Sequence, residues 1–366
     1  MIVSRTPFRI TLGGGGTDLP SYYRRYGGFV VAMGIDKYMY VMVNPPLADD
    51  KVRLHYTKSE VVDHIDELKH ELAREAMRLH GIYKKMEVAS MADLPAGAGL
   101  GSSSAYLVGL LNCLHHYRRE YVTLQELAEE ACYIEIDVLR KPVGKQDQYM
   151  AAYGGCTAID IATDGRVRVE QIQLDPGVAA ELIANTHLYF TGAIRDALGI
   201  LRKQSEKVGK AEAPGHEEAV NAMHAIKEIG YRSLEALQAG DLDAWGRLLH
   251  EHWEAKKRVS RSVTVPGIDE LYEEVRDRFG VLGGKIAGAG GGGFLLLYCP
   301  RRHAELEEFM ARCGLRRMHY AFEPEGSKVV ANVSSTWSDW LHGGNGTARP
   351  EGLGRVVWAG AGAACG

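Results

Sequence analysis

The stretch PAGAGLGSSSA at residues 95–105 decides how this sequence is interpreted. It places three glycines at alternate positions, follows them with three serines, and leads into an apolar-periodic segment that predicts a helix. Glycine lets backbone N–H groups approach an oxygen-rich ligand, serine hydroxyls add donors, and the first turn of a helix carries partial positive charge. The loop therefore predicts a binding site for a phosphate chain, and the alternative is a turn that only caps a helix.

Two better-known phosphate-binding loops do not fit this stretch. A P-loop needs a lysine and then Ser or Thr after its last glycine, whereas Gly101 is followed directly by Ser102 with no lysine nearby. The dinucleotide-binding fingerprint needs the spacing GxGxxG inside a βαβ unit, and Gly97, Gly99 and Ser102 do not satisfy that spacing. The stretch therefore indicates a phosphate loop of another type.

The composition is that of an ordinary globular protein. The chain has 366 residues, 46% hydrophobic and 25% charged, and at this length two domains are expected. The formal net charge of -4 gives no indication of a nucleic-acid or membrane partner. The six cysteines have no CxxC spacing, and no leader or membrane-length apolar run is apparent. We therefore expect reduced thiols and a cytoplasmic location, while the oligomeric state stays open.

Two further glycine-rich segments lie toward the ends of the chain. The first is a run of four glycines at 13–16, which follows a strand-like segment carrying Arg9 and precedes Thr17 and Asp18. The second is KIAGAGGGG at 285–293, which leads directly into an apolar segment. Because consecutive glycines cost backbone entropy on folding, each run indicates that something approaches the backbone closely there.

Two carboxylates stand out between these glycine segments. A helix is predicted over 123–139, and Glu135 falls in the middle of its apolar face, where an unpaired carboxylate would be costly. We expect Glu135 either to pair with a buried Arg or Lys or to bind a metal ion. After Pro142 and Gly144 a constrained turn carries Asp147, which is either a capping residue or a catalytic group.

The remaining pattern predicts an α+β chain. A composition break at 175–177 separates a strand-rich first half from a second half with an antiparallel sheet backed by helices, and the pattern stops after residue 335. The expected strands are 2–12, one or two within 29–43, 52–56, 86–91, 156–162, 166–174, 187–191, 294–298, 317–322 and 328–333. The expected helices, besides 123–139 and the one after the glycine-serine loop, are 60–80, 195–207, 216–239, 241–260, 267–279 and 301–313.

The three glycine segments together resemble a known family. PFRITLGGGGTDLPSYY, LPAGAGLGSSSA and KIAGAGGGGFLLL, in this order, resemble the three motifs of the GHMP small-molecule kinases, over residues 5 to about 333. Within it, the first motif and the turn GKQDQY most resemble bacterial D-glycero-α-D-manno-heptose 7-phosphate kinases, which phosphorylate an anomeric oxygen toward GDP-heptose for surface glycans. The resemblance implies two α+β domains, a ribosomal-S5-like domain at 1–185 and a ferredoxin-like domain at 186–335. A disordered tail is expected at 336–366.

The resemblance also implies roles for individual residues, with ATP and a sugar phosphate meeting between the two domains. Ser103 and Glu135 match the family's Mg²⁺ ligands, and Asp147 matches its catalytic carboxylate. Arg9 matches a motif arginine that would stabilise the γ-phosphate or hold Asp147 ionised. The implied ATP contacts are Pro95, Gly97, Ala98, Gly99, Leu100, Gly101, Ser102, Ser103 and Ser104, and the implied substrate contacts are Gly15, Gly16, Thr17, Asp18, Gly290 and Gly291.

A substrate that already carries a phosphate needs cationic partners. Lys145 is the leading candidate because it lies two residues from Asp147 in the sequence. His250 and His252 receive no role, because side chains two apart face different sides of a helix and the pair does not match HExxH. The further cationic candidates are Arg24, Arg25 and Arg195, and each of the four basic residues is otherwise a solvated surface charge.

Several alternatives stay open at this stage. The chain could be a GHMP kinase for galactose, fucose or an N-acetylhexosamine, since motifs for ATP do not distinguish sugars. It could also be a non-catalytic sugar sensor on the same fold. Because Ser103, Glu135 and Asp147 are all present, we expect an enzyme. The third glycine segment could likewise be only a tight turn before a strand.

Overall fold

Two β-sheets organise the described part of the chain. The computed structural model describes residues 1–192, 197–265 and 267–333. The larger sheet has eight strands in the order β12-β1-β2-β5-β3-β4, with β6 pairing to β2 and β7 to β6. The smaller sheet has the order β11-β8-β10-β9 and is antiparallel throughout. The predicted tail at 336–366 and the candidate Arg195 lie outside the described residues.

The larger sheet is built around the antiparallel pair β1, Ile2–Gly13, and β2, Gly28–Asn44. β2 is one continuous strand of 17 residues. Its first part pairs with β6 and its last part with β5, so this strand joins the two regions of the sheet. The other strands are β3 Val52–His55, β4 Ser59–Val62, β5 Met86–Ala92, β6 Cys156–Ile161, β7 Val167–Gln171 and β12 Lys328–Asn332.

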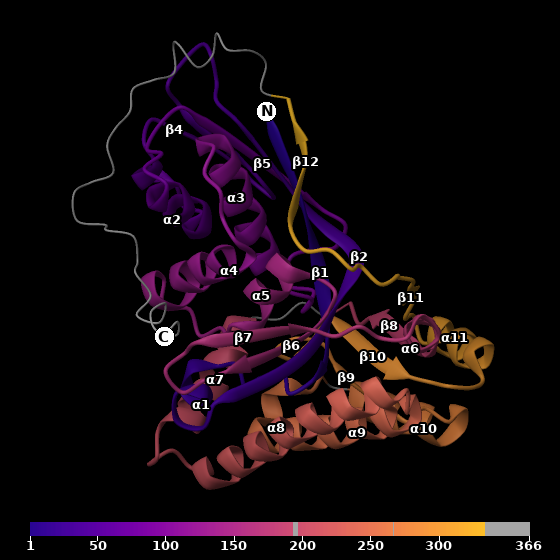
Figure 1. Cartoon of the computed structure of the whole chain (residues 1–366). Coiled ribbons are helices and arrows are strands. Elements are labelled where there is room, and N and C mark those ends of the chain that lie inside the picture. The colour runs from indigo at the N-terminus through magenta and orange to yellow at the C-terminus, as the bar shows by residue number, and fades with distance from the viewer. Residues whose placement is uncertain (193–196, 266, 334–366) are drawn as a thin grey trace, which may run out of the picture.

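Helix α3, Ser102–Arg118, begins directly after the middle glycine loop and packs on β1 and β2. Gly109 permits this contact, because a β-carbon there would lie 2.8 Å from Oγ1 of Thr6. Figure 1 shows α2, Glu71–Leu79, α4, Leu124–Cys132, and α5, Gln146–Tyr153, grouped around α3. The periodicity of the segment after the middle glycine loop predicts one apolar face on α3. Its four leucines, Leu107, Leu110, Leu111 and Leu114, are all buried.

The smaller sheet is covered by helices from the second half of the chain. Helices α8 and α9 pack side by side, and Figure 1 shows them with α10 below the sheets. α9 contacts β9, while α8 contacts β1 and β2, so this helical pair reaches both sheets. The strands are β8 Thr186–Phe190, β9 Gly283–Ile286, β10 Phe294–Tyr298 and β11 Arg317–Met318. The helices are α6 Pro176–Asn185, α7 Ala197–Gly209, α8 His216–Ala239, α9 Leu242–Val259, α10 Ile268–Phe279 and α11 His303–Arg312.

The structure corrects several predictions from the sequence. The last strand, β12, pairs with β1 in the larger sheet, although its position in the sequence had placed it in the C-terminal domain. The helix predicted over 60–80 starts only at Glu71, because β4 and a short 3-10 turn precede it. Helix α1, Pro20–Tyr26, and helices α5 and α6 had no periodic signal of their own. The domain division at residue 185 stays a prediction.

The secondary structure nevertheless has the predicted class. Mainly antiparallel sheets with helices packed on them constitute the α+β architecture expected from the sequence. None of the described helices combines the length and the apolar character needed to cross a bilayer.

Candidate active site

The middle and third glycine loops pack backbone against backbone. A β-carbon on Gly99 would lie 2.8 Å from the carbonyl oxygen of Ala287, and one on Gly288 would lie 2.6 Å from that of Gly99. A β-carbon on Gly293 would lie even closer to the Ala98 carbonyl oxygen, at 2.4 Å. Because the spacing leaves no room for any side chain, these positions need glycine. The contact fixes the loop that begins α3 against the loop that leads into β10.

Two glycines of the third loop pack against Val263. A β-carbon on Gly290 would lie 2.8 Å from Val263, and the N–H of Gly291 donates to the Val263 carbonyl at 2.7 Å. Both positions are therefore engaged by the short turn that follows α9. The assignment of Gly290 and Gly291 to the substrate stays a prediction, and the Gly291 N–H is already used by this contact.

Arg9 and Asp147 form an ion pair beside the middle loop. Nε of Arg9 donates to Oδ1 of Asp147 at 2.8 Å, and Nη2 lies 2.6 Å from the same oxygen. Nη1 of Arg9 donates to the Gly99 carbonyl at 2.9 Å, so one guanidinium holds both the carboxylate and the loop. The Arg9 side chain is 7% exposed and that of Asp147 is 31% exposed. The carboxylate thus keeps an open side although its charge is partnered.

Asp147 is held by a helix that the sequence did not predict. Where the sequence predicted a turn, the structure has the start of helix α5. Asp147 lies in the first turn of α5, where a negative charge is favoured. A β-carbon on Gly101 would lie 3.5 Å from the Asp147 carboxyl carbon. The carboxylate therefore lies directly beside the end of the phosphate loop.

Glu135 accepts hydrogen bonds from three side chains. Ser103 Oγ donates to Oε1 at 3.2 Å, while Ser104 Oγ and Gln148 Nε2 donate to Oε2 at 2.8 and 2.6 Å. Burial raises the pKa of this carboxyl, and the serine and glutamine hydrogen bonds oppose that rise. In the described part of the chain no Arg or Lys lies at ion-pair distance from it, so the buried-pair alternative does not hold.

Glu135 lies in a segment of unusual helix geometry. It lies in a π-helical segment, Tyr133–Val138, that follows α4. The N–H of Leu139 reaches back to the Ile134 carbonyl at 2.9 Å, one residue further than in an α-helix. Such π-helical turns recur at functional sites. Because carboxylate and hydroxyl oxygens suit Mg²⁺, the pair Ser103 and Glu135 fits the predicted metal.

The first glycine loop places Asp18 next to the same helix. Its carboxylate accepts the N–H of Gly16 at 3.0 Å and the N–H of Gln146 at 3.1 Å. Burial raises the pKa of Asp18, backbone hydrogen bonds lower it, and the charge of Asp147 raises it further. Asp18 and Asp147 are therefore electrostatic neighbours on adjoining elements.

Thr17 does not act as predicted. Its hydroxyl is fully buried and lies 2.8 Å from the carbonyl oxygens of Gly14 and Phe29, and it accepts the Phe29 N–H at 3.0 Å. All of these partners are backbone groups that hold the loop to β2. The structure therefore corrects its assignment to substrate binding and gives it a role in fixing the loop.

Lys145 is also corrected. Its amine donates to the Glu129 carboxylate at 3.1 Å and to the Gly165 carbonyl at 2.8 Å, and both charged side chains are buried. This ion pair joins the start of α5 to α4 and leaves no charge for a substrate phosphate. Arg24 and Arg25 lie exposed at the end of α1, as solvated surface charges do.

Three basic residues that received no role in the sequence analysis lie at this site. Lys256 and His252 are one turn apart on the same face of α9, and Lys285 lies on β9 just before the third loop. The Lys256 amine donates to the Gly288 carbonyl, and Nζ of Lys285 lies 3.5 Å from Nδ1 of His252. The i, i+4 spacing of His252 and Lys256 was a readable signal, whereas their meeting with Lys285 depends on the fold.

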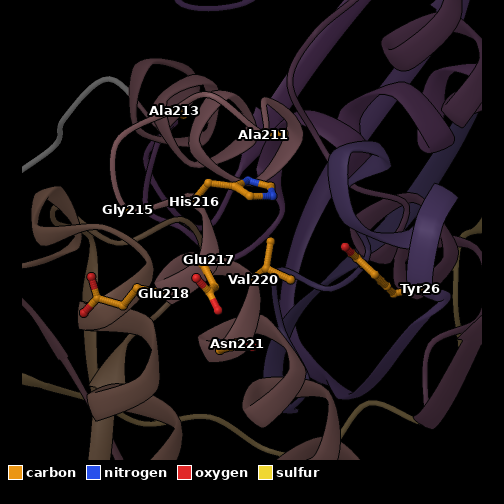
Figure 2. A pocket seen from close by; sticks show the side chains of 9 residues that line it. All are labelled: Tyr26, Ala211, Ala213, Gly215, His216, Glu217, Glu218, Val220 and Asn221. Atoms are coloured by element: carbon orange, nitrogen blue, oxygen red, sulfur yellow. The ribbon is translucent and has the colours of Figure 1, made fainter.

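A separate pocket opens away from the glycine loops. Figure 2 shows it between the end of α1 and the start of α8, with Tyr26 on one side and Glu217 and Glu218 on the other. None of the predicted site residues lines it. Two carboxylates at its wall would repel a phosphate, so the glycine loops remain the candidate site.

Comparisons with known proteins agree with this geometry. The model for the GHMP kinases N-terminal domain matches residues 62–155, and the model for the GHMP kinases C-terminal domain matches residues 233–314. D-glycero-alpha-D-manno-heptose 7-phosphate kinase of Campylobacter jejuni is 29% identical over 341 residues, or 89% of this chain and 98% of that protein. Galactokinase of Pyrococcus furiosus is 24% identical, over 88% of this chain and 97% of that protein.

Solved structures give the same result for the fold. The structure of a D-glycero-D-manno-heptose 1-phosphate kinase from Bacteroides thetaiotaomicron has a TM-score of 0.75 at 24% identity, covering 91% of this chain and 100% of that one. A putative sugar kinase from Campylobacter jejuni has a TM-score of 0.69 at 26% identity, covering 90% and 97%. The two-domain α+β fold predicted from the sequence is confirmed. The chain carries both family domains and belongs to the GHMP kinases, a family of phosphotransferases.

Proposed function

We propose that this chain is an ATP-dependent sugar kinase that phosphorylates the anomeric hydroxyl of D-glycero-D-manno-heptose 7-phosphate and produces the 1,7-bisphosphate. The observation that carries the proposal is Asp147, a half-open carboxylate paired with Arg9 between the phosphate loop and Asp18. The Campylobacter jejuni relative, whose name states this substrate, supports the choice of sugar.

The proposed reaction places the transfer at Asp147. The acceptor hydroxyl oxygen attacks the γ-phosphorus of ATP, the bond from that phosphorus to the β-phosphate oxygen breaks, and ADP leaves. Asp147 accepts the hydroxyl proton, and the hydrogen bond from Arg9 fixes the position of its carboxylate. Phosphoryl transfer needs mainly positioning and charge neutralisation, which this arrangement supplies.

The nucleotide side of the site uses the middle loop and its neighbours. The backbone of Gly97–Gly101 and the first turn of α3 offer N–H donors to the phosphate chain. Ser103 and Glu135 would hold Mg²⁺, which neutralises phosphate charge when it is bound. On the acceptor side, Asp18 and the backbone of the first glycine loop would receive sugar hydroxyls.

A coupled assay of ADP release with Mg²⁺ tests the function. The wild type is compared on D-glycero-D-manno-heptose 7-phosphate, galactose, fucose, mannose and N-acetylglucosamine, with Asp147→Asn beside it. We expect turnover with the phosphorylated heptose and a loss of about 1,000-fold or more in kcat for the variant, because the proton acceptor is removed. A preference for an unphosphorylated hexose would overturn the substrate, and sugar binding without turnover would restore the sensor alternative.

A further inference from the structure

A buried cluster of basic side chains lies where the first and third glycine loops meet. Lys256, Lys285 and His252 are 8%, 4% and 1% exposed. Besides the contacts already described, His252 lies against the Gly15 backbone. Lys256 is close enough to Arg9 and Asp18 to interact electrostatically with both. The basic cluster, defined as these three residues, therefore adjoins the loop assigned to the acceptor sugar.

The charges of the basic cluster are not balanced within the described residues. No carboxylate of the described chain lies at ion-pair distance from Lys256 or Lys285, and Asp147 is already paired with Arg9. A single buried donor would satisfy the Gly288 carbonyl, so that bond explains Lys256 at most. It does not explain a second lysine beside it, because two like charges in a dry site repel each other. An anionic ligand would remove this imbalance.

The basic cluster lies apart from the residues assigned to Mg²⁺. The side chains that bond Glu135 belong to α3 and α5, and the charges that act on it are those of Lys141 and Asp147. The basic cluster instead contacts Gly15 and Gly288, and its Lys256 interacts electrostatically with Asp18. It thus lies with the first glycine loop, not with the residues assigned to Mg²⁺.

The first loop leaves space beside the basic cluster. A β-carbon placed on Gly16 would have one heavy atom within 4 Å, the terminal methyl of Met223 at 3.8 Å. Gly16 thus presents backbone alone, where a larger side chain would occupy the volume, whereas a β-carbon on Gly15 would lie 2.9 Å from the Thr11 side chain. A ligand that extends past Asp18 could reach the two lysines over Gly16.

From this arrangement we infer that Lys256 and Lys285, supported by His252, bind the phosphate group that the acceptor sugar already carries. The inference deepens the proposed function and rests on it. Two ammonium groups from different elements match a phosphate monoester dianion in charge and in number of donors. In this assignment the basic cluster selects phosphorylated over unphosphorylated acceptors, and the reacting hydroxyl remains at Asp147.

The test compares two acceptors that differ only in the phosphate. ADP release is measured with D-glycero-D-manno-heptose 7-phosphate and with unphosphorylated D-glycero-D-manno-heptose, for the wild type, Lys256→Gln and Lys285→Met. Lys256→Gln keeps a donor for the Gly288 carbonyl and removes the charge. Lys257→Met is the matched control, because Lys257 lies next to Lys256 on α9 and pairs with Glu254 at the surface. The KM for ATP and the melting temperature are measured for every protein.

We expect each cluster variant to lower kcat/KM about 100-fold for the phosphorylated heptose and less than about threefold for the unphosphorylated one. Equal losses for both acceptors, or a raised KM for ATP, would place the basic cluster at the transferred phosphoryl group and overturn the inference. Variants that behave like Lys257→Met would overturn it while leaving the proposed function intact. A wild type that uses only unphosphorylated hexoses would overturn both.

Discussion

Two buried lysine sites in this protein look alike in the sequence and differ in their charge balance. Lys145 lies between α4 and α5, where Glu129 neutralises it. Lys256 lies between α9 and the third glycine loop, where its hydrogen-bond acceptor is a neutral carbonyl and Lys285 adds a second positive charge. Proximity to a motif pointed to Lys145. The internal balance of charge points instead to Lys256 as the ligand-binding lysine.

The pKa directions of Lys256 and Lys285 agree with their lack of an ion-pair partner in the described residues. Burial lowers the pKa of Lys256 to about 8, and the charge of Arg9 lowers it while that of Asp18 raises it. Burial and the charges of Lys256 and Arg9 hold the pKa of Lys285 well below its ordinary value. A buried group whose charged form is disfavoured until a partner arrives is typical of binding and catalytic sites.

The largest effect is expected when the Lys256 site is given the charge balance of the Lys145 site. Lys256→Glu places a carboxylate beside Lys285, as Glu129 stands beside Lys145. Lys285 is then neutralised internally, and the added carboxylate repels phosphate. We expect kcat/KM for the phosphorylated heptose to fall about 1,000-fold, measured by ADP release. Lys257→Glu is the control. Retention of full activity in Lys256→Glu would contradict the assignment.

The second prediction concerns the removal of the Lys145–Glu129 ion pair. Lys145→Met leaves Glu129 buried without its ion partner, so the free energy of unfolding should fall by about 3 kcal/mol, measured in urea. Adding Glu129→Gln should recover part of that loss, because the unpaired charge is removed. The KM for the phosphorylated heptose should stay within about threefold in the folded protein, and a selective rise would restore Lys145 as a substrate ligand.

The third prediction concerns pH. Phosphate binding favours protonated Lys256, which is faced by Arg9, Asp18, Lys285 and His252. Above its ligand-free pKa of about 8, each pH unit should raise the KM for the phosphorylated heptose about tenfold, until the pKa of the bound state is reached. The substrate phosphate is already a dianion in this range. A KM that is flat to pH 10 would contradict the role of Lys256.

The smallest effect is expected at Thr17, a polar group that, like Lys145, is used inside the fold. Thr17→Val removes the hydroxyl that joins the first loop to β2 and should lower the free energy of unfolding by about 1 kcal/mol. Chemical denaturation measures this loss. The KM for the acceptor should be almost unchanged, and a rise of tenfold or more without a stability change would return Thr17 to the substrate-binding residues.

The sequence predicted the elements that have a local pattern and missed those that depend on the fold. The α3 face and the inward position of Glu135 followed from helical periodicity, although the π-helical turn that contains Glu135 has no such signal. Helix α5 was missed because most of its residues are buried, which leaves no polar face. Lys285 lies 29 positions after Lys256, and the packing of α9 on β9 brings them together.

The central claim is that Asp147 and its surroundings direct phosphoryl transfer to the anomeric oxygen of a phosphorylated sugar. The most direct measurement is ³¹P NMR of the product formed from D-glycero-D-manno-heptose 7-phosphate, ATP and Mg²⁺. We expect a second phosphate resonance coupled to the anomeric proton, present with the wild type and absent with Asp147→Asn. Phosphate attached to another carbon, or the same product at an equal rate from Asp147→Asn, would contradict it.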